Sequence, residues 1–587
     1  MTGLRFVVVA DSHIRFPDDD VETYPSNSLM VARNEFVVDV CNRIGPAFVV
    51  HLGDIVHPLP VEDAHEAAVQ LAAGVYDRLE MPIHFVAGNH DIGDKPNAYV
   101  AVPPVAEENY GVFERFWGEP YKSFDSGDLH FTLIDTPVLN SGFQRELDQR
   151  AWLEADLAKA SAAGRRIFMF THYPPFIREA NENVHYDNLA EPARSRLLQL
   201  IEQHQVEAVF SGHVHNFLYN HLGRTEFYVL PSTGFTRPDY SELAAVLPDS
   251  ENGRDDPAKL GFFVIDVLAD GHRVTPIRTN GATGEAASLP VSLATSLDSQ
   301  WQSPVGVTLR HAWMSDIDFP TAGLDEFTRK TVRNDATLPA LWEARVNDLR
   351  IPIGDAATPE ARDRLRHLAG RGARFTLVSV GVPDEPTLGI ISQLDGAATR
   401  WEIATPVGSF AQIAAALATI GDKVDLPVAV GPITPIGSSD EAVHHFVSTG
   451  FDPQDDPLVD EWAGFDTARS VRELVFRVAP EAGISGSVES AHRAATEAGY
   501  SAVVLIDLPR SSESTTFEDD RALADRVAEA VGAALAHREA AIFLDSFMDH
   551  DRSYYPRHGL IDRHHNPRPG LVRLIEESSR GWITAGN

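Results

Sequence analysis

Residues 83–91 read Ile-His-Phe-Val-Ala-Gly-Asn-His-Asp and join a short apolar run to a polar turn. The run Ile83–Val86 is typical of a buried strand. Gly88 allows the backbone to turn sharply where that strand ends. The three side chains at positions 89–91 then leave the turn together, and each can bind a metal or transfer a proton. Because α/β sheets place ligand sites at the carboxyl ends of their strands, the stretch predicts a functional site here.

Four other predicted strands end in side chains that can bind a metal through oxygen or nitrogen. In extended chain, residues two apart point the same way, so two of these ends each present a pair of ligands on one face. None of the candidate ligands is a sulfur atom, which suits Mn, Fe or Zn in a catalytic site rather than a structural zinc site. The candidates are Asp11 and His13 after residues 4–10, Asp54 after 47–52, His172 after 166–171, and His213 and His215 after 206–210.

The first half of the chain alternates strands with segments of helical periodicity, which predicts an α/β sandwich. Residues 103–120 interrupt this pattern with a loop-like segment that contains Tyr110, Phe113, Phe116 and Trp117. Such a segment either covers a site or packs over a sheet edge. The predicted helices are 29–44, 64–79, 147–160 and 191–204; a strand is predicted at 129–135, and strands at 227–230 and 262–267 are expected to complete a second sheet.

The second half has a different pattern of predicted strands and helices. Residues 282–304 are rich in Ser, Ala and Thr, so we predict a linker there between a domain at 1–281 and a domain at 305–587. Eight apolar strand candidates, with helical stretches between nearly all of them, fill about 280 residues, which matches a (β/α)₈ TIM-like barrel. An open doubly wound sheet is the alternative. The candidates are 305–309, 344–353, 373–380, 399–403, 426–430, 471–478, 502–508 and 541–547.

The bulk composition restricts the classes of partner. A chain of 587 residues is too long for one hydrophobic core. Its net charge of -36 argues against a nucleic acid polymer or an anionic membrane, although bound metals can still attract a small anion. Cys41 is the only cysteine and cannot form an intrachain disulfide. No apolar run suits a signal peptide or a membrane span, so we expect a cytoplasmic enzyme, and a homo-oligomer is compatible with the sequence.

The five polar blocks together resemble the signature of calcineurin-like metallophosphoesterases. The resemblance covers residues 1–279 and implies an α/β/β/α sandwich. It is closest to the bacterial Asp-x-His phosphodiesterases and phosphatases, because the tyrosine ligand of purple acid phosphatases would fall near His57. The blocks are Asp11-Ser12-His13, Gly53-Asp54, Gly88-Asn89-His90-Asp91, His172 and Gly212-His213-Val214-His215.

The resemblance implies a role for each residue of a binuclear metal centre. Two cations that share a bridging hydroxide would neutralise the phosphoryl oxygens and provide the nucleophile. The implied substrate is a small phosphodiester, with a sugar or glyceryl moiety as a candidate, and a phosphomonoesterase or protein phosphatase is the alternative. Asp11, His13 and His215 would hold one metal; Asn89, His172 and His213 the other; Asp54 would bridge them; His90 would donate a proton; and Asp91 would orient its ring.

Further polar residues near these motifs are weaker candidates. His51, His57 and His185 are expected to be packing or surface histidines. Asn140 is a candidate substrate contact, with a turn-forming role as the alternative. Three arginines on loops, whose alternative role is a solvated surface, are candidate phosphate clamps. They are Arg15, Arg145 and Arg178.

Residues 399–403, Thr-Arg-Trp-Glu-Ile, resemble the fourth-strand segment of clan A glycoside hydrolases, which are (β/α)₈ enzymes. Thr405-Pro406 stands where that family has Asn-Glu, so a carboxylate that glycoside hydrolysis needs is absent. We therefore expect a barrel without glycosidase activity that binds a sugar-like group, caps the site or forms an oligomer interface. The rivals are a carbohydrate-binding protein with a vestigial metal site and a bifunctional enzyme that uses Asp545. A polar cluster follows the last strand: Asp545, His550, Asp551, Arg552, Tyr554, Tyr555 and Arg557.

Overall fold

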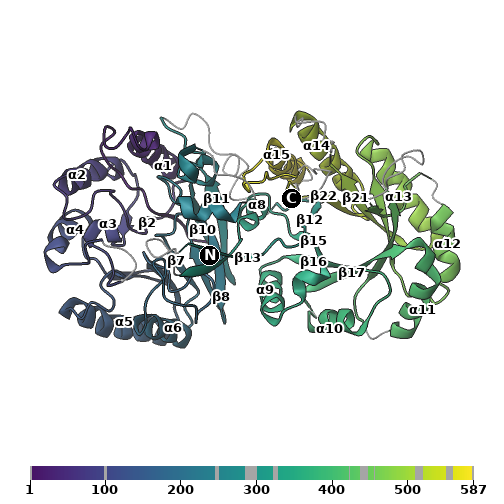
Figure 1. Ribbon diagram of the computed structural model, residues 1–587, viewed down its shortest axis with the longest axis horizontal. Coiled ribbons are helices and arrows are strands. Elements are labelled where there is room, and N and C mark those ends of the chain that lie inside the picture. Colours follow the sequence, from purple (N-terminus) through teal and green to yellow (C-terminus); the bar gives the residue numbers. More distant parts are fainter. Residues whose placement is uncertain are drawn as a thin grey trace. The chain divides into compact units, whose positions relative to one another are not determined.

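The computed structural model divides the chain into two compact units (Figure 1). The first unit comprises Met1–Ala294 and Met314–Pro339, and the second comprises Thr295–Trp313 and Ala340–Asn587. None of the helices in the described part of the chain is long and apolar enough to cross a membrane. The structure describes residues 3–97, 102–244, 250–284, 301–320, 328–394, 396–421, 424–435, 447–454, 457–508, 520–549 and 559–584.

Two sheets form the centre of the first unit. One has the strand order β11-β10-β1-β2-β3, in which β1, β2 and β3 are parallel and β10 runs antiparallel to β1. Its strands are β1 (Arg5–Val9), β2 (Val49–His51), β3 (Ile83–Phe85), β10 (Gly261–Leu268) and β11 (Gly271–Arg278). The other has the order β4-β5-β6-β7-β9-β8. Its strands are β4 (Lys122–Ser126), β5 (Leu129–Leu133), β6 (Arg166–Thr171), β7 (Ala208–Ser211), β8 (Leu218–Leu222) and β9 (Thr225–Val229).

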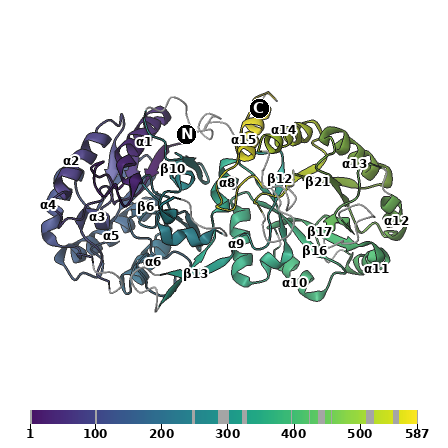
Figure 2. The same cartoon turned by 45° about the horizontal axis from the view of Figure 1, so that its top comes forward.

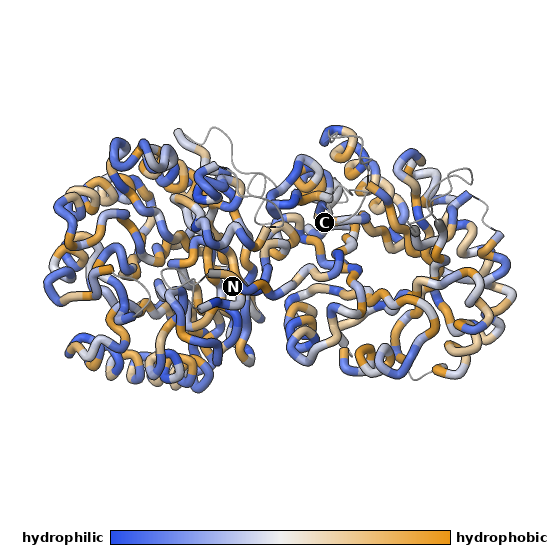
Figure 3. The backbone as a smooth tube through the Cα atoms, viewed as in Figure 1, coloured by the Kyte–Doolittle hydropathy of each residue, from blue (hydrophilic) through white to orange (hydrophobic). Residues whose placement is uncertain are grey.

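Aromatic rings fill the space between these two sheets. Phe6 of β1 meets Phe131 and Phe168 of the second sheet edge-on, with ring centroids 5.5 and 5.8 Å apart. Helices α1 (Met30–Ile44) and α2 (His65–Tyr76) cover one outer face, and α5 (Gln144–Ala162) and α6 (Ala193–Gln203) cover the other (Figure 2). The predicted α/β/β/α sandwich is thus confirmed. Hydrophobic and hydrophilic residues alternate along its helices, as amphipathic packing requires (Figure 3).

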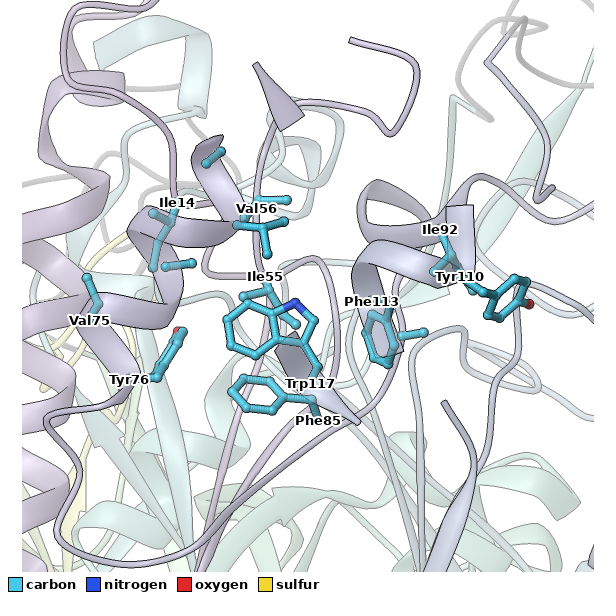
Figure 4. Close-up of a cluster of buried hydrophobic side chains, with 14 of the residues drawn as sticks. Ile14, Ile55, Val56, Val75, Tyr76, Phe85, Ile92, Tyr110, Phe113 and Trp117 are labelled. Atoms are coloured by element: carbon cyan, nitrogen blue, oxygen red, sulfur yellow. The ribbon is translucent and has the colours of Figure 1, made fainter. Parts of the chain in front are cut away.

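Part of the segment predicted to be loop-like, Pro103–Pro120, is helical. After α3 (Asn89–Ile92), it forms the short 3₁₀ helix η2 (Glu107–Asn109) and the helix α4 (Tyr110–Trp117). Tyr110, Phe113 and Trp117 are buried in a hydrophobic cluster with residues of β3 and α2 (Figure 4). The aromatic rings therefore form core rather than a cover over the site, because their spacing of three and four residues places them on one helix face.

The first unit also contains a hairpin that the predicted boundary at 282–304 assigned to the barrel. Strands β13 (Asp316–Pro320) and β14 (Arg329–Arg333) pair antiparallel. Phe319 and Val332 are fully buried against apolar residues of β8, β9 and the turn after β7. Sequence periodicity does not reveal which core such a short strand joins, because that contact is long-range.

The second unit is a closed barrel of eight parallel strands, as predicted, rather than an open sheet. Pairings of β22 with β12 and of β17 with β18 close the ring, and β19 (Val447–Thr449) adds an antiparallel edge to β18. The barrel strands are β12 (Gly306–Thr308), β15 (Asp348–Pro352), β16 (Arg374–Val380), β17 (Ala398–Pro406), β18 (Val428–Pro435), β20 (Glu473–Val478), β21 (Ser501–Asp507) and β22 (Ala541–Asp545).

Helices alternate with these strands and build the outer layer. They are α8 (Thr337–Glu343), α9 (Pro359–Gly370), α10 (Glu385–Gln393), α11 (Phe410–Ile420), α12 (Pro457–Phe465), α13 (Ile484–Ala498), α14 (Asp520–Ala536) and α15 (Pro569–Thr584). Short 3₁₀ helices complete the described elements: η1 (Pro25–Leu29), η3 (Pro238–Leu243), η4 (Ser250–Gly253), η5 (Pro257–Lys259), η6 (Ile353–Ala356) and η7 (Val407–Ser409).

Candidate metal centre

Seven candidate ligands meet at the carboxyl ends of the parallel strands of the first unit. β1, β2 and β3 are neighbours in one sheet, and β6 and β7 are neighbours in the other. Carboxyl ends of adjacent parallel strands meet at one sheet edge, so the residues that follow them converge. The seven are buried: Asp11, His13, Asp54, Asn89, His172, His213 and His215.

The first group of ligands is Asp11, His13, Asp54 and His215, whose donor atoms lie within 4.8 Å of one another. The Nε2 atoms of His13 and His215 are 3.0 Å apart. Nε2 of His215 is 3.6 Å from Oδ1 of Asp11. Each side chain therefore presents one donor atom to a common point.

The second group contains His172 and His213 together with Asp54. Asn89 joins it, because its Oδ1 lies 2.9 Å from Nε2 of His172 and 3.0 Å from Nδ1 of His213. The other ring nitrogen of His172 lies 2.9 Å from the Leu52 carbonyl. That contact fixes Nδ1 as the protonated nitrogen and leaves Nε2 with its lone pair toward the group.

Asp54 faces both groups with one carboxylate. Its Oδ2 is 3.5 Å from Nε2 of His13, and its Oδ1 is 3.4 Å from Nε2 of His172. Oδ1 also accepts a hydrogen bond of 2.8 Å from the His90 amide, which holds the carboxylate in this orientation. The geometry thus places Asp54 where a bridging ligand would stand.

The donor set fits metal cations. Metal–ligand bonds of about 2.0–2.2 Å separate neighbouring ligands by about 3 Å, which is the spacing seen in both groups. Burial lowers the pKa of His172 to about 3, and burial with neighbouring charges holds the pKa values of His13, His213 and His215 well below their usual range. These rings are therefore neutral, the form that binds metal. Burial, with Asp54 as the next cause, raises the pKa of Asp11, so two buried carboxylates here favour a neighbouring cation.

The backbone is strained where it presents these ligands. Five of the seven ligands adopt positive φ angles, a conformation that few residues other than glycine populate. Hydrogen bonds hold the strained turns, including those from the His13 amide to the Asp54 carbonyl at 3.0 Å and from the His213 amide to Oδ1 of Asp11 at 2.9 Å. Such over-determined strain is typical of functional sites. The angles are 54° at Asp11, 44° at His13, 51° at Asp54, 68° at His213 and 56° at His215.

His90 borders the ligand groups, and its ring is held by a backbone carbonyl. Nδ1 of His90 lies in short contact with the carbonyl of His57. Asp91, which is predicted to orient this ring, accepts hydrogen bonds from the amides of Gly88 at 2.9 Å and Ile55 at 3.0 Å. Asp91 therefore stabilises the turn that carries Asn89 and His90. Its Oδ2 binds the Gly88 amide after β3 and its Oδ1 binds the Ile55 amide after β2, so its carboxylate joins the two turns.

His57 reaches the centre, whereas His51 and His185 do not. Nδ1 of His57 is 3.2 Å from Nδ1 of His13, and His57 forms a third cluster with His13 and His90. His51 is hydrogen-bonded to Ser12, and His185 accepts a bond from the Asp187 amide, so both are buried packing residues. The close spacing of His57 to Asp54 in sequence was the available signal for its proximity.

The weaker candidates lie in other contacts. The Asn140 side chain donates to the Ala190 carbonyl at 3.0 Å and so stabilises a loop. Arg145 pairs with Glu114 at 3.0 Å, and Arg178 forms two bonds of 2.8 Å with Asp316. Arg15 lies 3.8 Å from Asp19; burial lowers the pKa of His57, and the charges of His90 and Arg15 add to that effect. Neither Arg145 nor Arg178 is free to clamp a phosphate in this arrangement.

Sequence reasoning missed a buried charged network beside His213. Asp187 bonds to Arg237, Lys330 and the Tyr240 hydroxyl, and its Oδ1 lies 3.6 Å from Nε2 of His213. Burial alone would raise the pKa of Asp187, but Arg237 and Lys330 hold it well below its usual range, so the carboxylate is ionised. No motif marks these residues, because they come together only through the fold.

Residues 4–217 match the family model described as calcineurin-like phosphoesterase. The matched residues lie in the first unit, which thus contains a calcineurin-like phosphoesterase domain. A relative in Danio rerio, serine/threonine-protein phosphatase CPPED1, is 32% identical over 179 residues, which are 29% of this chain and 54% of that protein. Purple acid phosphatase 23 of Arabidopsis thaliana is 31% identical over 160 residues, 26% of this chain and 32% of that protein. The chain thus spans only about half of the length of the first of these relatives, because the match covers 54% of that protein.

A solved structure titled "GAP50 the anchor in the inner membrane complex of Plasmodium" aligns with 48% of this chain and 87% of its own, with 16% identity and a TM-score of 0.32.

The barrel pairs its buried carboxylates with arginines. Glu402 of β17, the fourth barrel strand in chain order, is fully buried and forms two bonds with Arg350, of 2.7 and 2.6 Å. Asp545 bonds to Arg310 at 2.6 Å and to Arg477 at 2.8 Å. These pairs neutralise both carboxylates. The other members of the predicted cluster, His550, Asp551, Arg552, Tyr554, Tyr555 and Arg557, lie outside the described residues.

Proposed function

We propose that this protein is a binuclear metal-dependent hydrolase of phosphate esters. The observation that carries the proposal is the position of Asp54, whose two oxygens face the two ligand groups at 3.5 and 3.4 Å. A shared carboxylate between two sets of neutral imidazoles supports a pair of cations rather than a single ion. The cations themselves would be Mn, Fe or Zn, which O and N donors suit.

Bound cations would supply charge for the phosphoryl oxygens and an acidified water as the nucleophile. The protein's own residues would do the rest. Asp54 and Asn89 fix the positions of the two ligand groups relative to each other. The turns at Gly53 and Gly88, which carry them, approach so closely that a Cβ on Gly88 would lie 2.2 Å from the Asp54 amide. His90 stands beside His13, with ring centroids 4.6 Å apart, where it can pass a proton to the leaving group.

The role of His90 depends on its hydrogen bond to the His57 carbonyl. That bond places a proton on Nδ1 and leaves Nε2 as the atom available to substrate. Burial lowers the pKa of His90, although the His57 carbonyl and Asp91 partly offset this effect. A protonated donor therefore requires the negative charge of a bound phosphate nearby.

The substrate class is a choice between a phosphodiester and a phosphomonoester. The sequence motifs favour a small phosphodiester, for which a sugar or glyceryl moiety is a candidate. The names of the two relatives favour the second candidate, because one is a serine/threonine-protein phosphatase and the other a purple acid phosphatase. A carbohydrate-binding protein with a vestigial metal site is disfavoured, because all seven ligands converge.

The test compares p-nitrophenyl phosphate with bis(p-nitrophenyl) phosphate on protein reconstituted with Mn, Fe or Zn. Hydrolysis of either ester by the metal-loaded protein supports the proposal, and the faster ester decides the substrate class. Absence of hydrolysis of both, in protein that contains metal, would overturn it. In His90→Ala, turnover should fall while the metal content stays that of the wild type, since His90 is not among the ligands.

A further inference from the structure

The hairpin β13–β14 is an unusual part of the first unit, because the chain builds it from within the barrel sequence. The chain leaves the second unit after Trp313 and returns to it at Ala340. Between these points, Phe319 and Val332 join the hydrophobic cluster that contains Val214, which lies between the ligands His213 and His215. The hairpin therefore supports the turn that carries two of the candidate metal ligands.

Polar contacts fix the hairpin to the same region. Oδ2 of Asp335 accepts a bond of 2.9 Å from the Tyr219 amide, and Arg333 donates to the Tyr219 carbonyl at 2.6 Å. Arg178, which follows the His172 loop, is held by Asp316 through its two bonds of 2.8 Å. These contacts join the hairpin to β8 and to the segment after β6.

Lys330 of β14 carries a buried charge into this region. Its side chain is 1% exposed, and its amine bonds to Asp187 and, at 2.9 Å, to Oδ2 of Asp239. It also lies 4.5 Å from the centre of the Tyr240 ring. Alternation along the strand places Arg329 on the exposed face. Burying a cation is costly unless it is paired, so a buried lysine here is tied to the acids that it contacts.

Asp187 connects this charge to the metal centre. Lys330 and the Tyr240 hydroxyl both bond to its Oδ2, the latter at 2.9 Å. That leaves Oδ1, which Arg237 also contacts, directed at Nε2 of His213 at 3.6 Å. The carboxylate is fully buried, so its orientation is set by these partners.

The tautomer of His213 explains why the orientation of the Asp187 carboxylate matters. Nδ1 of His213 faces Asn89 in the second ligand group at 3.0 Å. With its Nδ1 lone pair directed at a cation, the neutral ring carries its proton on Nε2. Nε2 is buried and has no hydrogen-bond partner among the described residues. A carboxylate beside the N–H of a metal-binding histidine fixes the ring and raises its basicity.

We propose that Lys330 is a positioning residue of the metal centre, which acts through Asp187 to hold the His213 ring for the second ligand group. The inference rests on the proposed metal-dependent function and deepens it. It implies that a segment lying within the barrel sequence contributes to the metal centre.

Metal binding by the 587-residue chain tests the inference. The variant Lys330→Met keeps the length of the side chain and removes its charge, and Arg329→Met removes a neighbouring exposed charge from the same strand as the control. Partners of metal-binding histidines change metal affinity by about 10–100-fold when they are mutated. Titration of metal-free protein with Mn²⁺, monitored by calorimetry, should therefore show one of the two sites loosened by about that factor in Lys330→Met and neither site loosened in Arg329→Met.

A double variant separates positioning from general stability. If Lys330 acts through Asp187, adding Lys330→Met to Asp187→Asn should loosen the site little further, because coupled residues are not additive. Lys330→Arg should restore most of the affinity. Thermal melting of each variant confirms that the folded protein is titrated.

The outcomes distinguish this inference from the function on which it rests. Wild-type protein that binds none of Mn²⁺, Fe²⁺ and Zn²⁺ would overturn the proposed function and, with it, this inference. Wild-type protein with two Mn²⁺ sites, and Lys330→Met with the same two affinities, would overturn the inference alone. Additive losses in the double variant would also overturn it, since Lys330 would then act by a route that excludes Asp187.

Discussion

Substitution of Gly88 by alanine should displace Asp54. The added Cβ would lie 2.2 Å from the Asp54 amide nitrogen and 2.4 Å from its Oδ1, whereas ordinary contact begins at 3.4 Å. The carboxylate therefore has to move by about 1 Å, the difference between 2.4 and 3.4 Å. It has little room to do so, because Asp54 is 2% exposed and its Oδ1 is bonded to the His90 amide.

The size of the effect follows from that displacement. A misplacement of about 1 Å in a catalytic arrangement can lower the rate about 100-fold. Overpacking of a buried site also costs about 1–3 kcal/mol of unfolding free energy. We therefore expect Gly88→Ala to lose activity by at least about 100-fold while most of the protein remains folded at 25 °C.

The assay measures kcat for the better nitrophenyl ester, the metal content of the same sample and the urea denaturation midpoint. Gly74→Ala is the matched control, because Gly74 lies in α2 and an added Cβ there meets no atom within 4 Å. Alanine in a helix interior is favoured over glycine by about 0.5–1 kcal/mol, so this control should be slightly more stable and fully active. Gly88→Ala protein with the wild-type kcat and metal content would refute the reasoning.

Three further predictions concern stability. Trp117→Ala should lower the unfolding free energy by about 3–5 kcal/mol in urea denaturation and leave kcat per folded molecule unchanged, because the ring is core; a selective loss of kcat would instead indicate a cover over the site. His130 contacts Asp156 and Asp125 at 2.8 and 2.7 Å; burial lowers its pKa, but these carboxylates raise it above 6.5 overall. The stabilisation that protonated His130 provides is therefore complete below about pH 6.5 and is lost as the pH rises through the folded pKa. The difference in unfolding free energy between wild type and His130→Gln should thus shrink with rising pH, and a difference that widens would contradict this. Chelation by EDTA should lower the melting temperature, because metal at a free concentration of about 100 times its Kd stabilises the folded protein by about 2.7 kcal/mol. An unchanged melting temperature in protein shown to have lost its metal would contradict this prediction.

The sequence allowed the sandwich, the barrel and the convergence of the ligands to be predicted, because each depends on local signals. Strand periodicity located β1, β2, β3, β6 and β7, and parallel pairing then brought their carboxyl ends together. The spacing of Asp11 and His13, and of His213 and His215, also indicated which side chains share a face. None of these inferences required knowledge of a distant contact.

One missed element, the helix α4, was encoded in a local pattern, whereas the contacts of Asp91 were not. The aromatic residues of α4 had helical spacing, so a closer count of Tyr110, Phe113 and Trp117 would have predicted a buried helix. No such signal existed for Asp91, whose carboxylate bonds to two backbone amides once the turn has formed.

Charged side chains were the hardest to predict. Arg145 and Arg178 lie on loops near the motifs, but Glu114 and Asp316 bind them. Lys330 stands far from every motif in sequence, and only the packing of β13–β14 on the first unit brings it to Asp187. An arginine or lysine pairs with whichever acid the fold brings near, and that acid is set by tertiary structure.

The most direct test of the central claim is the metal content and phosphoester turnover of Asp54→Asn, with Asp77→Asn as the control for loss of an exposed carboxylate at the end of α2. Because one Asp54 carboxylate faces both ligand groups, the account predicts that wild type and Asp77→Asn bind about two metal ions per chain, whereas Asp54→Asn loses metal and at least about 100-fold in turnover. Asp54→Asn protein that keeps both metals and the wild-type rate would contradict it.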